Sequence, residues 1–204
     1  MLLETEQTIW AACAAIVIMI GIFIYKSRQN QRPEPSLPSM PPPPAPLTAE
    51  DSLLLATQAL NEQEFNRAES LAREGITLQS GATRTRSSLH NLLGSIFATQ
   101  KKKKEALEQF QKAIAIDPDF SYPHSNLGNI YFMEKNFPQA EKAYLEAIRI
   151  NPDHADAYSN LGILYKAQKK IDSAIQNFQK AVDLNADCKE AQDNLSALQK
   201  AKRN

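Results

Sequence analysis

Three asparagines, Asn126, Asn160 and Asn194, follow one another at intervals of 34 residues. An asparagine amide carries both a donor and an acceptor, so a row of such side chains can hydrogen-bond to the backbone of an extended peptide regardless of the peptide's sequence. The alternative is that these amides hold neighbouring helices together. The chemistry that this spacing indicates is therefore hydrogen bonding, either to a polypeptide partner or within the fold.

Residues for covalent or acid–base chemistry are sparse. His90 and His124 are also 34 residues apart, and a shared place in a repeat favours ring packing over a role as ligand or base. His154 is expected to be exposed. The sequence contains no Gly-rich phosphate loop, no nucleophile elbow and no His or Cys pair at metal-ligand spacing. We therefore expect no enzymatic activity, no cofactor and no metal site.

The same period governs the apolar residues, because residues 87–120, 121–154 and 155–188 align without a gap. The shared columns are Leu93, Leu127 and Leu161; Gly94, Gly128 and Gly162; Phe97, Tyr131 and Tyr165; Ala106, Ala140 and Ala174; Phe110, Tyr144 and Phe178; and Ala113, Ala147 and Ala181. In each unit the apolar positions recur at helical spacing in two groups, which predicts two helices. The Gly and Ala columns are expected where these helices approach closely, beside the large residues.

This pattern closely resembles the tetratricopeptide repeat (TPR), whose 34-residue unit consists of two antiparallel helices. The resemblance implies an all-α fold, an α-α superhelix of the TPR solenoid type. One unit cannot bury its apolar faces alone, but stacked neighbours can. It further implies that the first helices of the units line a concave groove, toward which the asparagine column points. A similar asparagine ladder occurs in the peptide-binding superhelix of O-linked N-acetylglucosamine transferases.

The repeat register divides the chain. Residues 48–86 are expected to form a degenerate first repeat followed by a four-residue insertion, Thr83 to Arg86. The second, third and fourth repeats are residues 87–120, 121–154 and 155–188. Residues 189–204 carry Ala191, Leu195 and Leu198 on one face and charges elsewhere, which predicts a solvating cap helix.

The resemblance also assigns candidate residues to the peptide-binding groove. They are Asn91, Ser95, Tyr122, Asn126, Asn129, Phe132, Met133, Asp156, Asn160, Ile163, Lys166 and Asn194. Tyr122, Phe132 and Met133 would provide an adaptable apolar anchor point. The two-carboxylate clamp of chaperone-binding TPR domains needs a cation where Asp156 stands, and only Asn126 fits that pattern. Capture of chaperone tails is therefore not expected.

An uncharged stretch of 18 residues, from Thr8 to Tyr25, follows a short acidic tail at residues 1–7. At about 1.5 Å per residue it spans roughly 27 Å, which predicts one transmembrane helix. The alternative is a cleaved signal peptide followed by a secreted or periplasmic module, but the leading stretch lacks basic residues and no small-x-small cleavage site follows. Basic residues Lys26, Arg28 and Arg32 predict that the repeats are cytoplasmic and the N-terminus outside, in a bacterial inner membrane or an organelle membrane.

The linker at residues 26–47 is basic at first and then proline-rich. Eight of the fourteen residues from Pro33 to Pro46 are proline, which predicts a semi-rigid spacer reaching about 40 Å. A docking site for a proline-recognising domain is the alternative. The Lys101 to Lys104 run is expected in the turn of the second repeat as a solvated loop, with contact to anionic lipid as the alternative.

Composition narrows the classes of partner. The formal net charge is zero, so we expect no general attraction to nucleic acid. The two cysteines, Cys13 and Cys188, stand far apart and are not expected to pair.

Taken together, these features predict a membrane-tethered protein–protein interaction module, a scaffold or assembly factor that binds a peptide or protein in its groove. The alternatives are an accessory subunit recruiting substrates to a separate enzyme, and a homo-oligomeric scaffold.

Overall fold

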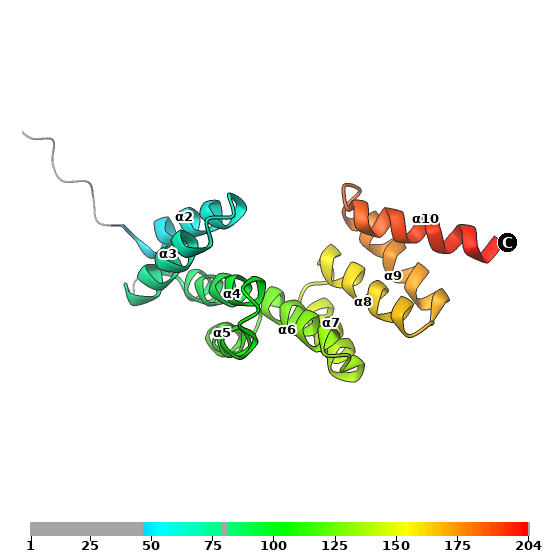
Figure 1. Cartoon of the computed structure of the whole chain (residues 1–204), viewed down its shortest axis with the longest axis horizontal. Coiled ribbons are helices and arrows are strands. Elements are labelled where there is room, and N and C mark those ends of the chain that lie inside the picture. Colours follow the sequence, from blue (N-terminus) through cyan, green and yellow to red (C-terminus); the bar gives the residue numbers. More distant parts are fainter. Residues whose placement is uncertain (1–46, 79–80, 204) are drawn as a thin grey trace, which may run out of the picture. The chain divides into compact units, whose positions relative to one another are not determined.

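Nine α-helices build residues 47–78 and 81–203, the part of the chain that the computed structural model describes (Figure 1). They are α2 (Ala49–Asn61), α3 (Phe65–Thr77), α4 (Thr83–Thr99), α5 (Lys103–Ile116), α6 (Ser121–Met133), α7 (Phe137–Ile150), α8 (Ala155–Ala167), α9 (Ile171–Leu184) and α10 (Lys189–Arg203). No strand occurs in these two ranges. The predicted all-helical, TPR-like solenoid is confirmed.

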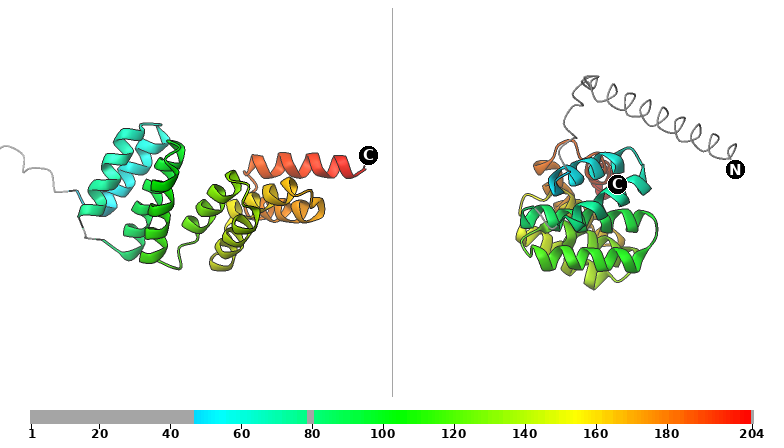
Figure 2. Two further views of the ribbon diagram at one scale, coloured as in Figure 1. Left: turned by 60° about the horizontal axis from the view of Figure 1, so that its bottom comes forward. Right: turned by 90° about the vertical axis from the view of Figure 1, so that its left-hand side faces the viewer.

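The helices pair in chain order, and Figure 2 shows the pairs following one another. The second helix of each pair also contacts the first helix of the next, as α5 contacts α6. First helices contact each other across the pairs, α4 with α6 and α6 with α8. The second helices α3, α5, α7 and α9 make no such contact with one another within the described ranges. Because neighbours lie closer on the side of the first helices, that side is the inner, concave side of the stack.

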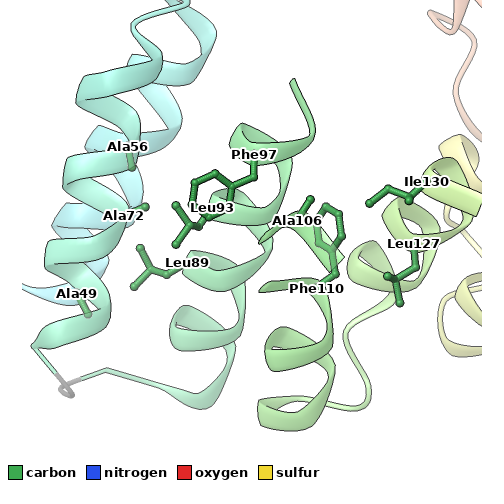
Figure 3. Packing of buried hydrophobic residues seen from close by; sticks show 10 residues of the cluster. All are labelled: Ala49, Ala56, Ala72, Leu89, Leu93, Phe97, Ala106, Phe110, Leu127 and Ile130. Atoms are coloured by element: carbon green, nitrogen blue, oxygen red, sulfur yellow. The ribbon is translucent and has the colours of Figure 1, made fainter. Parts of the chain in front are cut away.

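Each regular pair is held together by a glycine that faces an aromatic ring. A Cβ atom at Gly128 would lie 2.5 Å from Cε1 of Tyr144, and one at Gly94 would lie 2.6 Å from Cε1 of Phe110. The close approach of helices expected at the glycine column is therefore present. Phe110 belongs to one buried cluster that extends from α2 to α6 (Figure 3).

The turns inside all four pairs adopt one geometry. A residue with positive φ follows the first helix in each case, namely Gln63, Lys101, Lys135 and Lys169. In the third pair the amide of Asn136 donates to the carbonyl of Tyr131 and that of Lys135 to Phe132, which is the Schellman pattern of helix termination. Because Gln63 shares this geometry, the degenerate first repeat turns like the others despite its divergent sequence.

The four-residue insertion, Thr83 to Arg86, forms the first turn of α4 and makes it the longest of the described helices. Arg84 ties this turn to the loop before α6, since its Nε lies 3.0 Å from a carboxylate oxygen of Asp117 and its guanidinium lies 4.6 Å from the centre of the Phe120 ring. The insertion therefore extends a helix and adds contacts to the second repeat.

Two further features refine the sequence-based expectations. Only part of the lysine run lies in the turn, because α5 begins at Lys103. At the other end of the stack, α10 buries Ala191, Leu195 and Leu198 against α9 and α8.

None of the helices in residues 47–78 and 81–203 is both long and apolar enough to cross a membrane. The acidic tail at residues 1–7, the predicted membrane segment at residues 8–25 and the linker as far as residue 46 lie outside the described residues.

Lys135 offers a test of the turn geometry. Its φ of 59° is unfavourable for a residue with a Cβ atom, so we expect Lys135→Gly to raise the free energy of unfolding by about 1 kcal/mol. Lys142, exposed within α7, is the matched control, and Lys142→Gly should lower it by about 1 kcal/mol. Urea unfolding followed by circular dichroism measures both. Equal losses in the two variants would contradict the assigned turn.

Candidate functional site

Two adjoining hollows lie on the inner side of the stack, one on each side of α6. The first has a volume of about 530 Å³ and is lined by Ser95, Ala98, Lys101, Lys103, Phe110, Asn126, Asn129, Ile130, Met133 and Glu134. The second has a volume of about 270 Å³ and is lined by Tyr122, Ser125, Asn126, Asn129, His154, Asp156, Ser159, Asn160, Cys188 and Glu190. Asn126 and Asn129 line both hollows, so the hollows adjoin at α6, and we call the two together the α6 groove.

The first hollow is apolar inside and basic at its edge. Ala98 and Ile130 contribute its apolar wall, and Met133, which is 81% exposed, stands at its rim. Lys101 and Lys103 also line it, and Lys103 forms an ion pair with Glu134. The hollow can therefore accept an apolar side chain while its edge favours a negative charge.

The second hollow is polar. Asp156 and Glu190 face it from α8 and α10, and neither carboxylate forms an ion pair with a residue in the described ranges. Tyr122, 48% exposed, contributes an aromatic ring. Among the residues that the structure describes, no lysine or arginine lines this hollow. Its charge is therefore opposite to that of the basic edge.

The shared amides have fixed orientations. Asn126 donates through Nδ2 to Oδ1 of Asn91 at 2.9 Å and lies 3.5 Å from Oγ of Ser95, which leaves Asn126 Oδ1 as an acceptor. Asn129 Oδ1 accepts from the Tyr144 hydroxyl at 2.8 Å, which leaves Asn129 Nδ2 as a donor. Residues three apart on a helix are neighbours on its surface. The α6 groove therefore presents an acceptor and a donor side by side.

The asparagine ladder also bridges repeats. Asn160 Nδ2 lies 3.4 Å from Oγ of Ser125 on the preceding first helix, just as Asn126 bonds to Asn91. Asn194 departs from this pattern, because it donates to the carbonyl of Glu190 and accepts from Lys166. Two members of the ladder, Asn126 and Asn160, therefore hold neighbouring helices together and also line the groove, while hydrogen bonding of the ladder to a peptide stays a prediction.

The structure brings many of the predicted groove residues together and places others elsewhere. Ser95, Tyr122, Asn126, Asn129, Met133, Asp156 and Asn160 line the hollows. Phe132 packs against Phe137, with 5.9 Å between ring centres, and Ile163 packs against a buried cluster. Asn91 lies behind Asn126, while Lys166 and Asn194 bond to each other outside both hollows.

Sequence reasoning missed several lining residues. Phe110 and His154 lie at the groove although the repeat pattern marks the first as core and the second as a unit boundary. Cys188 and Glu190 come from the junction of α9 and α10, where the cap helix closes the second hollow. Their placement depends on how α10 packs, and the shared second column, Tyr122, Asp156 and Glu190, was the available signal.

The prediction that His154 is exposed is wrong. His154 is the residue directly before α8, and it is only 4% exposed. It is buried because its ring packs against the ring of Tyr122, with 4.4 Å between ring centres. Burial lowers the pKa of His154, and it also lowers the pKa of His90 and His124. His90 hydrogen-bonds through Nδ1 to Gln109. Within residues 47–78 and 81–203, no three His, Cys, Asp or Glu side chains are arranged to hold a metal ion.

Family models for the TPR match residues 121–187 and residues 94–135. The chain is a tetratricopeptide-repeat protein. Among solved structures, this TPR protein is similar to pilF of Pseudomonas aeruginosa, with 22% identity over 76% of this chain and 69% of that chain and a TM-score of 0.66. It is also similar to MamA, with 25% identity, coverage of 68% and 78%, and a TM-score of 0.54.

A third similar structure is YrrB, described as a TPR protein with an unusual peptide-binding site. It shares 19% identity over 71% of this chain and 72% of its own, with a TM-score of 0.53. No curated protein matches the sequence. At identities this low, the likeness to pilF and to YrrB shows a common fold alone.

The buried histidines predict how stability changes with pH. An unfolded histidine has a pKa near 6.5, whereas burial lowers that of His154 in the folded TPR stack, so the unfolded chain binds more protons below about pH 6.5. Stability should therefore fall as pH decreases from 7.5 to 5.5. His154→Phe keeps a ring beside Tyr122 and should flatten this dependence, measured as the unfolding temperature across that range. An equally steep dependence in the variant would contradict the role of His154.

Proposed function

We propose that the α6 groove binds an extended segment of a protein partner. The observation that carries the proposal is the pair of shared amides: Asn126 presents an acceptor and Asn129 a donor where the two hollows meet. A peptide backbone offers a donor and an acceptor at each residue. Such pairing gives affinity that does not depend on sequence, while the hollows on either side receive side chains.

The groove is built to bind without large rearrangement. Asn126 is held by Asn91 on α4, and Asn129 by Tyr144 on α7, so both amides keep their orientation before a partner arrives. A preformed site avoids the entropy cost of ordering side chains on binding. Met133 can adapt to different apolar side chains, because its thioether chain is flexible and polarisable.

The membrane context completes the proposed function. In this proposal residues 8–25 are an anchor, residues 26–47 are a basic and proline-rich arm, and the TPR stack faces the cytoplasm. Confinement to a membrane surface raises the effective concentration of partners found there. The function that fits is that of a non-enzymatic scaffold or assembly factor for a membrane-associated complex.

Met133 tests the groove. Met133→Lys places a third cation beside Lys101 and Lys103 and removes an exposed apolar anchor, so recovery of the partner should fall about fivefold or more. The measurement is affinity purification of the full-length protein from its host in mild detergent, with quantitative mass spectrometry.

Leu145→Lys is the matched control, because Leu145 is an exposed apolar residue on the second helix α7. It should leave recovery unchanged. Both variants should keep the parent's circular dichroism and unfolding temperature. Equal recovery of the partner with Met133→Lys and with the parent would show that the partner does not bind in the groove.

The anchor is tested by fractionation. The full-length protein should sediment with membranes and remain there after carbonate extraction, whereas a chain that begins at Leu47 should be soluble. Protease added to intact cells or organelles should spare the TPR stack, since basic residues after an anchor favour the cytoplasmic side. Solubility of the full-length chain after carbonate treatment would contradict the anchor.

A further inference from the structure

We infer that the α6 groove selects a segment carrying one apolar side chain and, about three residues away, a lysine or arginine. The apolar side chain occupies the first hollow and the cation the second. This inference rests on the proposed function, because it assigns side chains to a peptide that the groove must first bind. It is carried by the opposite charges of the two ends of one groove.

The first hollow excludes the cation. Lys101, Lys103 and Glu134 line it, and the charge of Lys103 is paired with that of Glu134, which leaves Lys101 as the charge without an ion-pair partner in the described part of the chain. A lysine or arginine placed there would meet like charge. An apolar side chain fits instead, against Ala98, Ile130 and Met133. An acidic residue next to it in the bound segment could form an ion pair with Lys101.

The second hollow receives the cation. Asp156 and Glu190 offer two carboxylates with no ion-pair partner among residues 47–78 and 81–203. Oδ1 of Asn126 is a further acceptor on the same wall. The exposed ring of Tyr122 can lie against a lysine stem or a guanidinium, an arrangement that is attractive through the ring's π-system.

Unpartnered polar atoms in the wall of the second hollow support a polar occupant. Ser159 is 2% exposed and His154 4% exposed, and neither Ser159 Oγ nor His154 Nε2 has a hydrogen-bond partner in the described ranges. Buried polar groups without partners are costly. A side chain that enters beside Tyr122 with donors to spare can satisfy Ser159, whose equivalent in the preceding repeat, Ser125, already has a partner in Asn160.

The geometry of the stack sets the spacing. Helices in contact lie about 8–10 Å apart, and an extended chain advances about 3.3 Å per residue. The two hollows lie on opposite sides of α6, between α4 and α6 and between α6 and α8. The apolar residue and the cation should therefore be about three positions apart.

The test is selection of peptides from a phage-displayed library of random dodecamers on the full-length protein in detergent. Selected peptides should share an apolar residue and a Lys or Arg about three positions away. The double variant Asp156→Asn, Glu190→Gln should lose the preference for the basic residue. The matched control is Glu105→Gln, Asp183→Asn, which removes two exposed carboxylates on second helices outside both hollows and should keep the preference.

A thermodynamic cycle gives the magnitude. The best selected peptide is synthesised with its Lys or with Gln in that place, and its Kd is measured by fluorescence anisotropy. The Lys peptide should bind the Asp156→Asn, Glu190→Gln variant about three- to tenfold more weakly than the parent, while the Gln peptide should bind both equally. Added salt should weaken only the Lys peptide on the parent.

The outcomes distinguish a failure of this inference from a failure of the proposed peptide binding in the α6 groove. If selected peptides lose binding to Met133→Lys but show no basic residue, or keep their basic preference on the double variant, the groove binds peptides and the assignment of the second hollow is wrong. If the parent enriches no peptide, or the selected peptides bind Met133→Lys as well as the parent, both the groove function and the assignment fall.

Discussion

A glycine packed directly against an aromatic ring joins the two helices of each regular TPR unit. Gly94 faces Phe110, Gly128 faces Tyr144 and Gly162 faces Phe178, all at distances that leave no room for a Cβ atom. The rings are almost fully buried, so this close contact lies in the core of each unit, where it brings the two helices together. Everything else in the stack follows from the way such hairpins lie on one another, including the closer spacing of the first helices that creates the inner side.

One of these rings connects the core to the α6 groove. Tyr144 replaces the phenylalanine found at Phe110 and Phe178, and its hydroxyl donates to Asn129. Burial raises the pKa of the Tyr144 phenol, so the hydroxyl stays protonated and remains a donor at neutral pH. In the flanking units the rings are Phe110 and Phe178, which have no hydroxyl to donate, and Ser95 and Ile163 stand at the positions that correspond to Asn129. The middle unit therefore fixes an amide donor at the point where the two hollows meet.

The sequence predicted the helix pairs and the small-against-large packing, because a 34-residue period records contacts that recur in every unit. The side of the stack expected to carry the groove came from the resemblance to the TPR. What it could not predict depends on single departures from the period. Lys101, Lys135 and Lys169 occupy a left-handed position where glycine is the usual residue, so residue type gave no sign of the turn geometry. His154 looked like an exposed boundary residue, and only the packing of Tyr122 over it explains its burial. The second hollow required α10 to be placed before Glu190 could be assigned to it.

The three asparagines of the ladder share one column of the repeat, but they do not all make the same hydrogen bonds. Asn126 and Asn160 each reach back to the preceding first helix and fix the spacing between neighbouring units. If Asn194 continued the pattern it would bond to Ser159, but it turns instead to Glu190 and Lys166, so the last step of the ladder is open. Among the described residues, Ser159 is left buried without a hydrogen-bond partner at this step. The second hollow lies at the same step, and the carboxylates of Asp156 and Glu190 that line it form no ion pair within residues 47–78 and 81–203. The departure of Asn194 from the repeat therefore removes an amide bond between helices at the place where polar groups line the hollow.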